Sequence, residues 1–107
     1  MLPKKNRLSS KQFSQTLKKS NVYRGNTLNI RYRSSFKPIT QVAIVISKKI
    51  DPKATKRNKL KRQISSAIRS YVMGAHKLDL IFFLKTKTDS QNYINEIMQW
   101  LKKSPLN

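Results

Sequence analysis

The stretch from residue 56 to residue 69 reads Lys-Arg-Asn-Lys-Leu-Lys-Arg-Gln-Ile-Ser-Ser-Ala-Ile-Arg, and it constrains the fold most. At 3.6 residues per turn its apolar side chains fall on one stripe, which must be buried against another part of the chain. The members of this stripe are Leu60, Ile64, Ala67, Ile68 and Tyr71. The charges on the remaining surface are all positive, because no acidic residue lies between Asp51 and Asp79. Like charges four residues apart repel, so this single-sign polar face predicts a polyanionic partner.

The charge of the whole chain is distributed unevenly and supports this prediction. The 107 residues carry 24 Lys and Arg against four Asp and Glu, which gives a net charge of +20. Residues 1–78 hold 20 of the basic and one of the acidic residues, so we expect the binding surface there and a scaffold in residues 79–107. Because such an excess repels itself in a compact monomer, it predicts a partner that supplies negative charge.

Three kinds of partner could supply that charge: nucleic acid, an anionic membrane or an acidic protein. A membrane-binding helix would carry large aromatic side chains on its apolar face, whereas Leu60, Ile64 and Ile68 are ordinary core residues. The longest apolar run, residues 80–84, is far too short to span a bilayer. We therefore expect a soluble, cytoplasmic, monomeric protein that binds nucleic acid and has no membrane partner.

The local patterns predict one domain that spans residues 1–107, with residues 1–7 as a basic extended arm. Ser9 and Gln12 form a capping box, which predicts a helix that ends near residue 19. Residues 28–33 alternate between apolar and polar side chains, as in a half-buried strand with a basic outer face.

Two apolar runs and two further helix starts complete the expected order of elements. Residues 41–47 predict a central strand buried on both faces, and residues 78–84 predict another strand. Asp51-Pro52 supplies an N-cap and an N1 proline for the basic helix, which should end near Met73. Asp89 caps a last helix that Pro105 should end. The order predicts an α+β fold, with three helices packed on a small mixed sheet of about four strands.

The residue types that proteins use for hydrolysis are scarce and scattered in this chain. The four carboxylates are far apart in sequence, His76 is the one histidine, and there is no cysteine. Two glycines cannot form a glycine-rich phosphate loop. We therefore expect no catalytic residue and no metal ion or cofactor bound by the protein alone.

Three stretches resemble the protein component of bacterial ribonuclease P over nearly the full length of the chain. They are Leu2–Leu8 followed by Phe13, then Ser47-Lys48-Lys49 at the end of a strand, and Arg57–Arg62 at the start of the basic helix. The strand Asp79–Lys85 is similar as well. The resemblance implies an α/β sandwich with a left-handed strand–helix–strand crossover, an exception to the right-handed rule.

The resemblance also implies a function, which is the removal of the 5′ leader from precursor tRNA. In that family a catalytic RNA that uses Mg²⁺ carries out the cleavage, and the protein is the non-catalytic subunit. The protein binds the catalytic RNA and holds the leader in a cleft beside the basic helix. The implied partners are therefore the RNA subunit and the precursor tRNA leader.

By match to the family, Arg57, Asn58 and Lys59 take the contact with the catalytic RNA and Lys61 takes the leader side. The expected RNA-binding residues are Arg57, Asn58, Lys59, Lys61, Arg62, Arg69, Lys48, Lys49 and Arg7. The expected leader-cleft residues are Phe13, Leu17, Arg31, Tyr32 and Lys61. The register of the strand over residues 28–33 leaves open whether Arg31 or Tyr32 lines the cleft.

The chain departs from the family pattern at several places. Lys59 stands where the family has arginine, so a bidentate phosphate contact becomes a point charge. Ser65-Ser66 replaces the usual Arg-Glu, so Arg69 is expected to take part of that leader contact. Two other functions are compatible with the residues alone: a small ribosomal or other RNA-binding protein without a processing role, and a self-sufficient nuclease.

Overall fold

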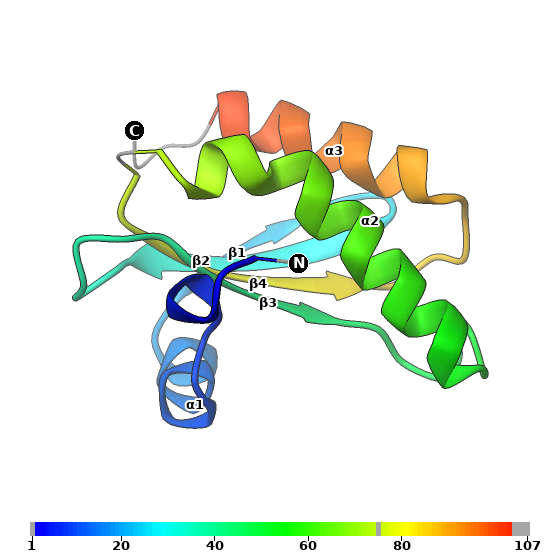
Figure 1. Cartoon of the computed structure of the whole chain (residues 1–107), viewed down its shortest axis with the longest axis horizontal. Helices are drawn as coiled ribbons and strands as arrows, with labels where there is room; N and C mark the ends of the chain where they lie inside the picture. The colour runs from blue at the N-terminus through cyan, green and yellow to red at the C-terminus, as the bar shows by residue number, and fades with distance from the viewer. Residues whose placement is uncertain (1, 75, 104–107) are drawn as a thin grey trace.

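A four-stranded mixed sheet with helices on both faces organises the chain in the computed structural model, which describes residues 2–74 and 76–103 (Figure 1). The elements are η1 (Lys4–Asn6), α1 (Ser10–Lys18), β1 (Asn21–Arg24), β2 (Leu28–Ser34), β3 (Gln41–Val45), α2 (Ala54–Val72), β4 (Leu78–Leu84) and α3 (Ser90–Lys102). The strand order is β1-β2-β4-β3; β3 is parallel to β4, and the other pairs are antiparallel. The predicted α+β class, with three helices and a mixed sheet, is confirmed.

The two faces of the sheet are covered differently. Helices α2 and α3 lie side by side over one face, and α1 lies on the other (Figure 1). Alternate residues of the strands, such as Ile30 and Phe82, enter the core with the apolar sides of α2 and α3. Trp100, which the sequence analysis did not place in the core, is buried there as well. Among the described residues, no helix combines the length and apolar character that a bilayer crossing requires.

The position of the two apolar strands differs from the prediction. The run expected to be the central strand forms β3, which lies at the edge of the sheet, and β4 takes the central place. The edge of β3 is covered by the chain start, since Arg7 bridges to Val42 and the Leu8 N–H donates to the Val42 carbonyl at 3.1 Å. This cover explains why β3 is apolar although it has only one strand neighbour. Strand β1 was not predicted.

The chain start is a packed segment and not the extended arm that was expected. Leu2 is buried in the core, residues Lys4–Asn6 form a turn of 3₁₀ helix, and the buried Asn6 amide donates to the Thr40 carbonyl at 2.9 Å. Gln41 holds the same segment through the Lys5 carbonyl at 3.0 Å. We call residues 2–8 the N-terminal segment. Its backbone follows the free edge of β3 and therefore fixes the basic side chains it carries.

Two of the three helix starts agree with the predicted caps. Ser9 accepts a hydrogen bond from the Gln12 N–H before α1, and Asp89 accepts one from the Asn92 N–H before α3. Helix α2 starts later than predicted, at Ala54, with Lys53 as its N-cap. The Asp51 carboxylate accepts from the Lys53 N–H at 3.0 Å and so closes a turn before the helix, where a cap was expected. Pro105, the expected helix stop, lies outside the described residues.

The buried face of α2 is rotated relative to the predicted stripe. Ile64 and Ile68 are buried as expected, but Ala67 is exposed, Val72 is buried outside the predicted stripe, and Ser65 is buried next to the N-terminal segment. The difference arises because Leu2 of that segment packs beside α2, which adds a neighbour on the Ser65 side. Ser65 therefore faces the space between α2 and the N-terminal segment, where little of its surface is exposed.

The Glu96 carboxylate of α3 holds the turn between β1 and β2. It accepts hydrogen bonds from the Tyr23 hydroxyl at 2.8 Å, from the Asn26 N–H at 2.9 Å, and from the Thr27 N–H and hydroxyl at 2.8 and 2.6 Å. Partial burial would raise the pKa of Glu96, but these donors outweigh it and lower the pKa from 4.5 to about 2. A side chain at Gly25 would overlap this carboxylate, which accounts for the glycine in the turn.

We expect Glu96→Gln to lower the free energy of unfolding by about 1–2 kcal/mol, a value reduced for solvent screening because the group is partly exposed. The melting temperature should fall by about 5–10 °C. Because the pKa is depressed in the folded state, this contribution is complete above pH 4.5 and is lost as the pH falls towards about 2.

Thermal unfolding followed by circular dichroism between pH 7 and pH 3 measures both effects. The variant should lose less stability than the wild type across the acid range, since it has no carboxylate to protonate at this turn. Asp51→Asn, which removes a carboxylate that contacts one backbone N–H, is the control and should have a smaller effect. Equal acid sensitivity of Glu96→Gln and the wild type would contradict the assignment.

Candidate nucleic-acid interface

Helix α2 presents its cations on two flanks, and a hollow lies along each. Lys59 and Arg62 line one hollow together with Ser90 and Ile94 at the start of α3. Lys61 lines the hollow on the other flank, together with Arg7 of the N-terminal segment. We call these the Lys59 hollow and the Lys61 hollow. Lys59 and Lys61 therefore lie on opposite flanks of α2, which agrees with the different RNAs predicted for them, whereas their RNA contacts stay predictions.

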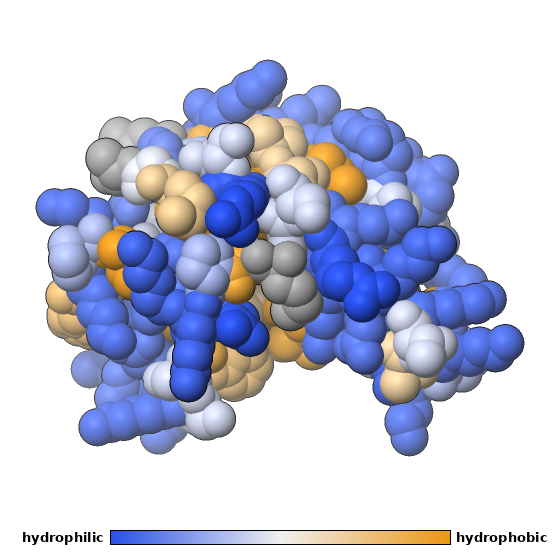
Figure 2. All heavy atoms as spheres, in the orientation of Figure 1, coloured by the Kyte–Doolittle hydropathy of each residue, from blue (hydrophilic) through white to orange (hydrophobic). Residues whose placement is uncertain are grey.

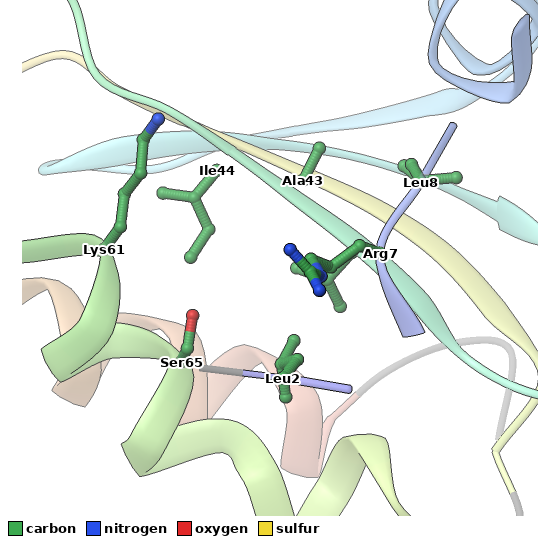
Figure 3. A pocket seen from close by; sticks show the side chains of 8 residues that line it. Leu2, Arg7, Leu8, Ala43, Ile44, Lys61 and Ser65 are labelled. Carbon is green, nitrogen blue, oxygen red and sulfur yellow. The ribbon is translucent and has the colours of Figure 1, made fainter. Parts of the chain in front are cut away.

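The Lys61 hollow has an apolar wall and two cationic side chains (Figure 3). Lys61 and Ser65 project from α2 towards β3, and Arg7 extends into the same space from the N-terminal segment. The apolar lining residues are Leu2, Leu8, Val42, Ala43 and Ile44. A hollow of this kind can accept the apolar face of a base while the cations contact phosphates.

The cations in the first half of α2 are available to a partner. Within the described residues, Lys59, Lys61 and Arg62 form no ion pair with a carboxylate. The first turn of α2 carries no acidic residue, and its N-cap makes no side-chain hydrogen bond, so the positive end of the helix dipole adds to the side-chain charge. The start of α2 therefore has the charge and the free N–H groups that can attract phosphate groups.

Arg57 also holds the loop before α2 in place. Its guanidinium donates from Nη1 to the Asp51 carbonyl at 2.9 Å, and the side chain is half-buried. It therefore fixes the loop that leads into α2 while its remaining N–H groups can contact phosphate. Asn58 is exposed beside it, and Lys48 and Lys49 are exposed in the loop between β3 and α2.

Arg69 lies apart from the cations at the start of α2. It lies in the last turn of α2, about 15 Å along the helix axis from Lys59. The structure thus groups eight of the nine predicted RNA-binding residues around the first half of α2, the loop before it and the N-terminal segment. Arg69 lies at the opposite end of the helix.

Three of the five predicted leader-cleft residues, Phe13, Leu17 and Arg31, gather on the α1 face of the sheet, whereas Lys61 lines the hollow beside α2. The Phe13 ring of α1 lies 6.5 Å from the Phe83 ring of β4, and Arg31 of β2 donates to the Leu17 carbonyl at 3.3 Å. Leu17, Arg31 and Phe83 line a shared hollow, the α1 hollow, together with Val22, Arg24 and Asn29. Figure 2 shows a hollow on the lower side of the molecule, between the part that carries α1 and the part that carries the start of α2.

Tyr32 lines neither the Lys61 hollow nor the α1 hollow, and its place in the leader cleft is a correction. It points to the face covered by α2 and α3, where its ring packs against Trp100 with the centroids 4.9 Å apart. Alternation along β2 puts Arg31 on the opposite face, beside α1. Arg31 is therefore the residue of this pair that reaches the hollow.

The lining residues that the sequence did not predict include Phe83 and Ile44. Both lie in apolar runs that were predicted as strands without a binding role. Alternation within residues 78–84 places Leu80, Phe82 and Leu84 in the core and Phe83 on the α1 face, which is a signal that the sequence did contain.

Comparisons with known proteins agree with each other. A family model described as Ribonuclease P matches residues 2–104. The chain is 31% identical over 96 residues to the ribonuclease P protein component of Pseudanabaena sp. (strain PCC 6903), which covers 87% of this chain and 83% of that protein. It is 29% identical over 111 residues to that of Nitrosomonas eutropha, which covers 96% and 90%.

Two solved structures have a similar fold. The RNase P protein from Thermotoga maritima superimposes with a TM-score of 0.74 at 21% identity, over 91% of this chain and 96% of that chain. The Staphylococcus aureus RNase P protein gives a TM-score of 0.80 at 19% identity, over 94% and 96%. At these identities the structures show a common fold.

Proposed function

This chain belongs to the ribonuclease P protein family, and from that premise we propose that it is the protein subunit of a ribonucleoprotein endoribonuclease that removes the 5′ leader from precursor tRNA. The observation that carries the proposal is the placement of the α2 cations on two flanks, each beside a hollow. One surface can then hold the catalytic RNA while the other holds the substrate. A ribosomal role is not favoured, given the family.

We assign the chemistry to the RNA subunit, since each carboxylate of the protein has a structural partner. Asp51 closes the turn before α2, Asp89 caps α3, Glu96 holds the β1–β2 turn, and Asp79 pairs with Arg33 at 3.0 Å. Among the described residues, no three acidic, histidine or cysteine side chains form a group that could hold a metal ion. The residues present do not fit a magnesium site of the protein's own, so in this proposal the RNA binds the Mg²⁺.

The two RNAs are assigned to different surfaces. Arg57, Asn58, Lys59 and Arg62, with the loop that carries Lys48 and Lys49, contact the catalytic RNA through its phosphates. The Lys61 hollow and the α1 hollow hold the single-stranded leader, where cations meet phosphates and apolar side chains meet bases. The protein acts as a monomer in the cytoplasm alongside these RNAs, because a net charge of +20 opposes self-association.

Cleavage should require the RNA subunit. Purified protein with Mg²⁺ and end-labelled precursor tRNA should release no leader, whereas addition of the RNA subunit from the same organism should give cleavage at the mature 5′ end. Mature tRNA as competitor should bind the complex more weakly than precursor. Cleavage by the protein alone would show a self-sufficient nuclease, and a protein without effect on the RNA-catalysed reaction would refute the proposed role.

A further inference from the structure

Phe36 is the most exposed large apolar side chain among the described residues, at 86% exposure. It lies in the loop between β2 and β3, where Ser34, Ser35, Lys37 and Pro38 surround it. Single exposed apolar residues are common on protein surfaces and need no function. What distinguishes this ring is the arrangement of charge and hydrogen bonds around it.

A cation lies against one face of the Phe36 ring. The Arg33 guanidinium carbon is 5.2 Å from the ring centroid, and Arg33 is itself held by the ion pair with buried Asp79 at 3.0 Å. Such a contact orients the ring, because the guanidinium is attracted to its electron-rich face. The Arg33–Asp79 pair thus positions the ring.

The loop that carries the ring is tied to the rest of the fold at both ends. The Ser35 N–H donates to the Lys77 carbonyl at 2.8 Å, and the Thr40 hydroxyl donates to the His76 carbonyl at 2.7 Å. The Lys37 N–H donates to the Ser35 hydroxyl at 3.1 Å within the loop. A ring on an anchored loop loses little conformational entropy when a ligand stacks on it.

The residue after Phe36, Lys37, borders a groove that is lined by cations. Lys37 lines this groove together with Lys4, Lys5 and Arg7, and no carboxylate is among its lining residues. Arg7 and Leu8 also line the Lys61 hollow, so the two hollows meet at the N-terminal segment. A basic path therefore runs from Lys61 past Arg7 and ends at Lys37, the residue that follows Phe36 in the chain.

We propose that Phe36 is a stacking site for an unpaired base of the leader, upstream of the nucleotides held in the Lys61 hollow. The proposal rests on the function proposed above and adds a second leader contact to it. The groove cations bind the leader phosphates, and the ring face remote from Arg33 stacks on a base without selecting its identity, since every base presents a π-face.

The position of the ring favours the leader over the catalytic RNA as the occupant. Phe36 precedes β3, whereas Lys48 and Lys49 follow it, so the strand separates them by about 16 Å. Figure 1 shows the loop between β2 and β3 at one end of the sheet and the start of α2 at the other. The basic path, in contrast, leads from the Lys61 hollow to Lys37, which is adjacent to Phe36 in the chain.

The test compares precursor tRNAs whose single-stranded leaders have about four and about twelve nucleotides, lengths within the usual range of single-strand sites. Phe36→Ala should weaken binding of the holoenzyme to the long-leader precursor by about 5- to 150-fold, the range for loss of one stacked base. Binding of the short-leader precursor and assembly with the RNA subunit should be unchanged. Because the ring is exposed, the substitution should not alter the melting temperature.

Phe36→Trp should keep the tight binding of the long leader and supply a spectroscopic signal. When the long leader binds, stacking of a base on the introduced indole should quench the fluorescence of that indole, and the short leader should not. Buried Trp100 contributes a constant background to the fluorescence. Met73→Ala, which removes another exposed apolar side chain, is the matched control and should behave as the wild type.

Three outcomes would overturn the proposal. Wild-type affinity of Phe36→Ala for the long leader would show that the ring makes no contact, and equal losses for both leaders would exclude a distal site. Weakened assembly with the RNA subunit would make the catalytic RNA the occupant. A failure of the proposed function itself is detected with the wild type alone, because the wild-type holoenzyme would then bind precursor and mature tRNA with equal affinity.

Discussion

Raising the salt concentration from about 50 to about 200 mM should weaken binding of the protein to its RNA subunit by about 130- to 500-fold. Each phosphate contact releases condensed counterions, and the slope of log K against log salt is about −0.7 to −0.9 per contact. Five of the cations at the start of α2 and in the loop before it are assigned to the RNA subunit, which predicts a total slope of about −3.5 to −4.5. These residues are Lys48, Lys49, Arg57, Lys59 and Arg62.

Filter binding or fluorescence anisotropy at four or more salt concentrations measures this slope. Lys59→Ala should make it shallower by roughly one contact, about 0.7 to 0.9, because the side chain forms no ion pair within the described part of the chain. Lys102→Ala removes an equal charge from the last turn of α3 and should leave the slope unchanged. A nearly flat slope for the wild type would indicate a dry, uncharged interface and contradict the assignment.

The features that the sequence predicted correctly depend on neighbours in the chain. The N-caps at Ser9 and Asp89 involve residues within one helical turn, so local pattern is sufficient to find them. The single charge sign of α2 is likewise a property of consecutive residues, and the structure leaves Lys59 and Lys61 on opposite flanks as the helical period requires.

The features that the sequence did not predict depend on distant contacts. The apolar runs of β3 and β4 look alike, and the N-terminal segment, which covers the β3 edge, explains why an edge strand is mostly apolar. Ser65 became buried because of the same segment. The bonds from Glu96 to the β1–β2 turn join residues about 70 positions apart, and no local pattern encodes them.

The family resemblance predicted the two RNA partners, and the geometry restricts which side chains can contact each of them. Tyr32 packs on Trp100, so Arg31 remains for the leader. Arg57 is tied to the Asp51 carbonyl, so its replacement would disturb the start of α2 as well as an RNA contact. A clean separation of the two RNA surfaces therefore needs substitutions at other positions.

Paired substitutions on the two flanks of α2 should separate the two binding steps. Lys59→Ala with Arg62→Ala removes both cations of the Lys59 hollow, and Lys61→Ala with Arg7→Ala removes both cations of the Lys61 hollow. Each lost charged hydrogen bond costs about 1–3 kcal/mol, so each pair should weaken its own step by about 30-fold to 10⁴-fold. Lys102→Ala with Lys103→Ala lowers the net charge equally at the end of α3 and serves as the matched control.

The readout is a pair of titrations for every variant, protein with RNA subunit and assembled holoenzyme with precursor tRNA. We expect the Lys59–Arg62 pair to weaken the first titration and the Lys61–Arg7 pair to weaken the second, with a loss of preference for precursor over mature tRNA. General loss of charge would reduce both steps slightly in all three double variants, because long-range attraction depends on net charge and not on position. If both flank variants weakened both steps to the same extent, α2 would be one undifferentiated basic surface, and the assignment of its flanks to different RNAs would be wrong.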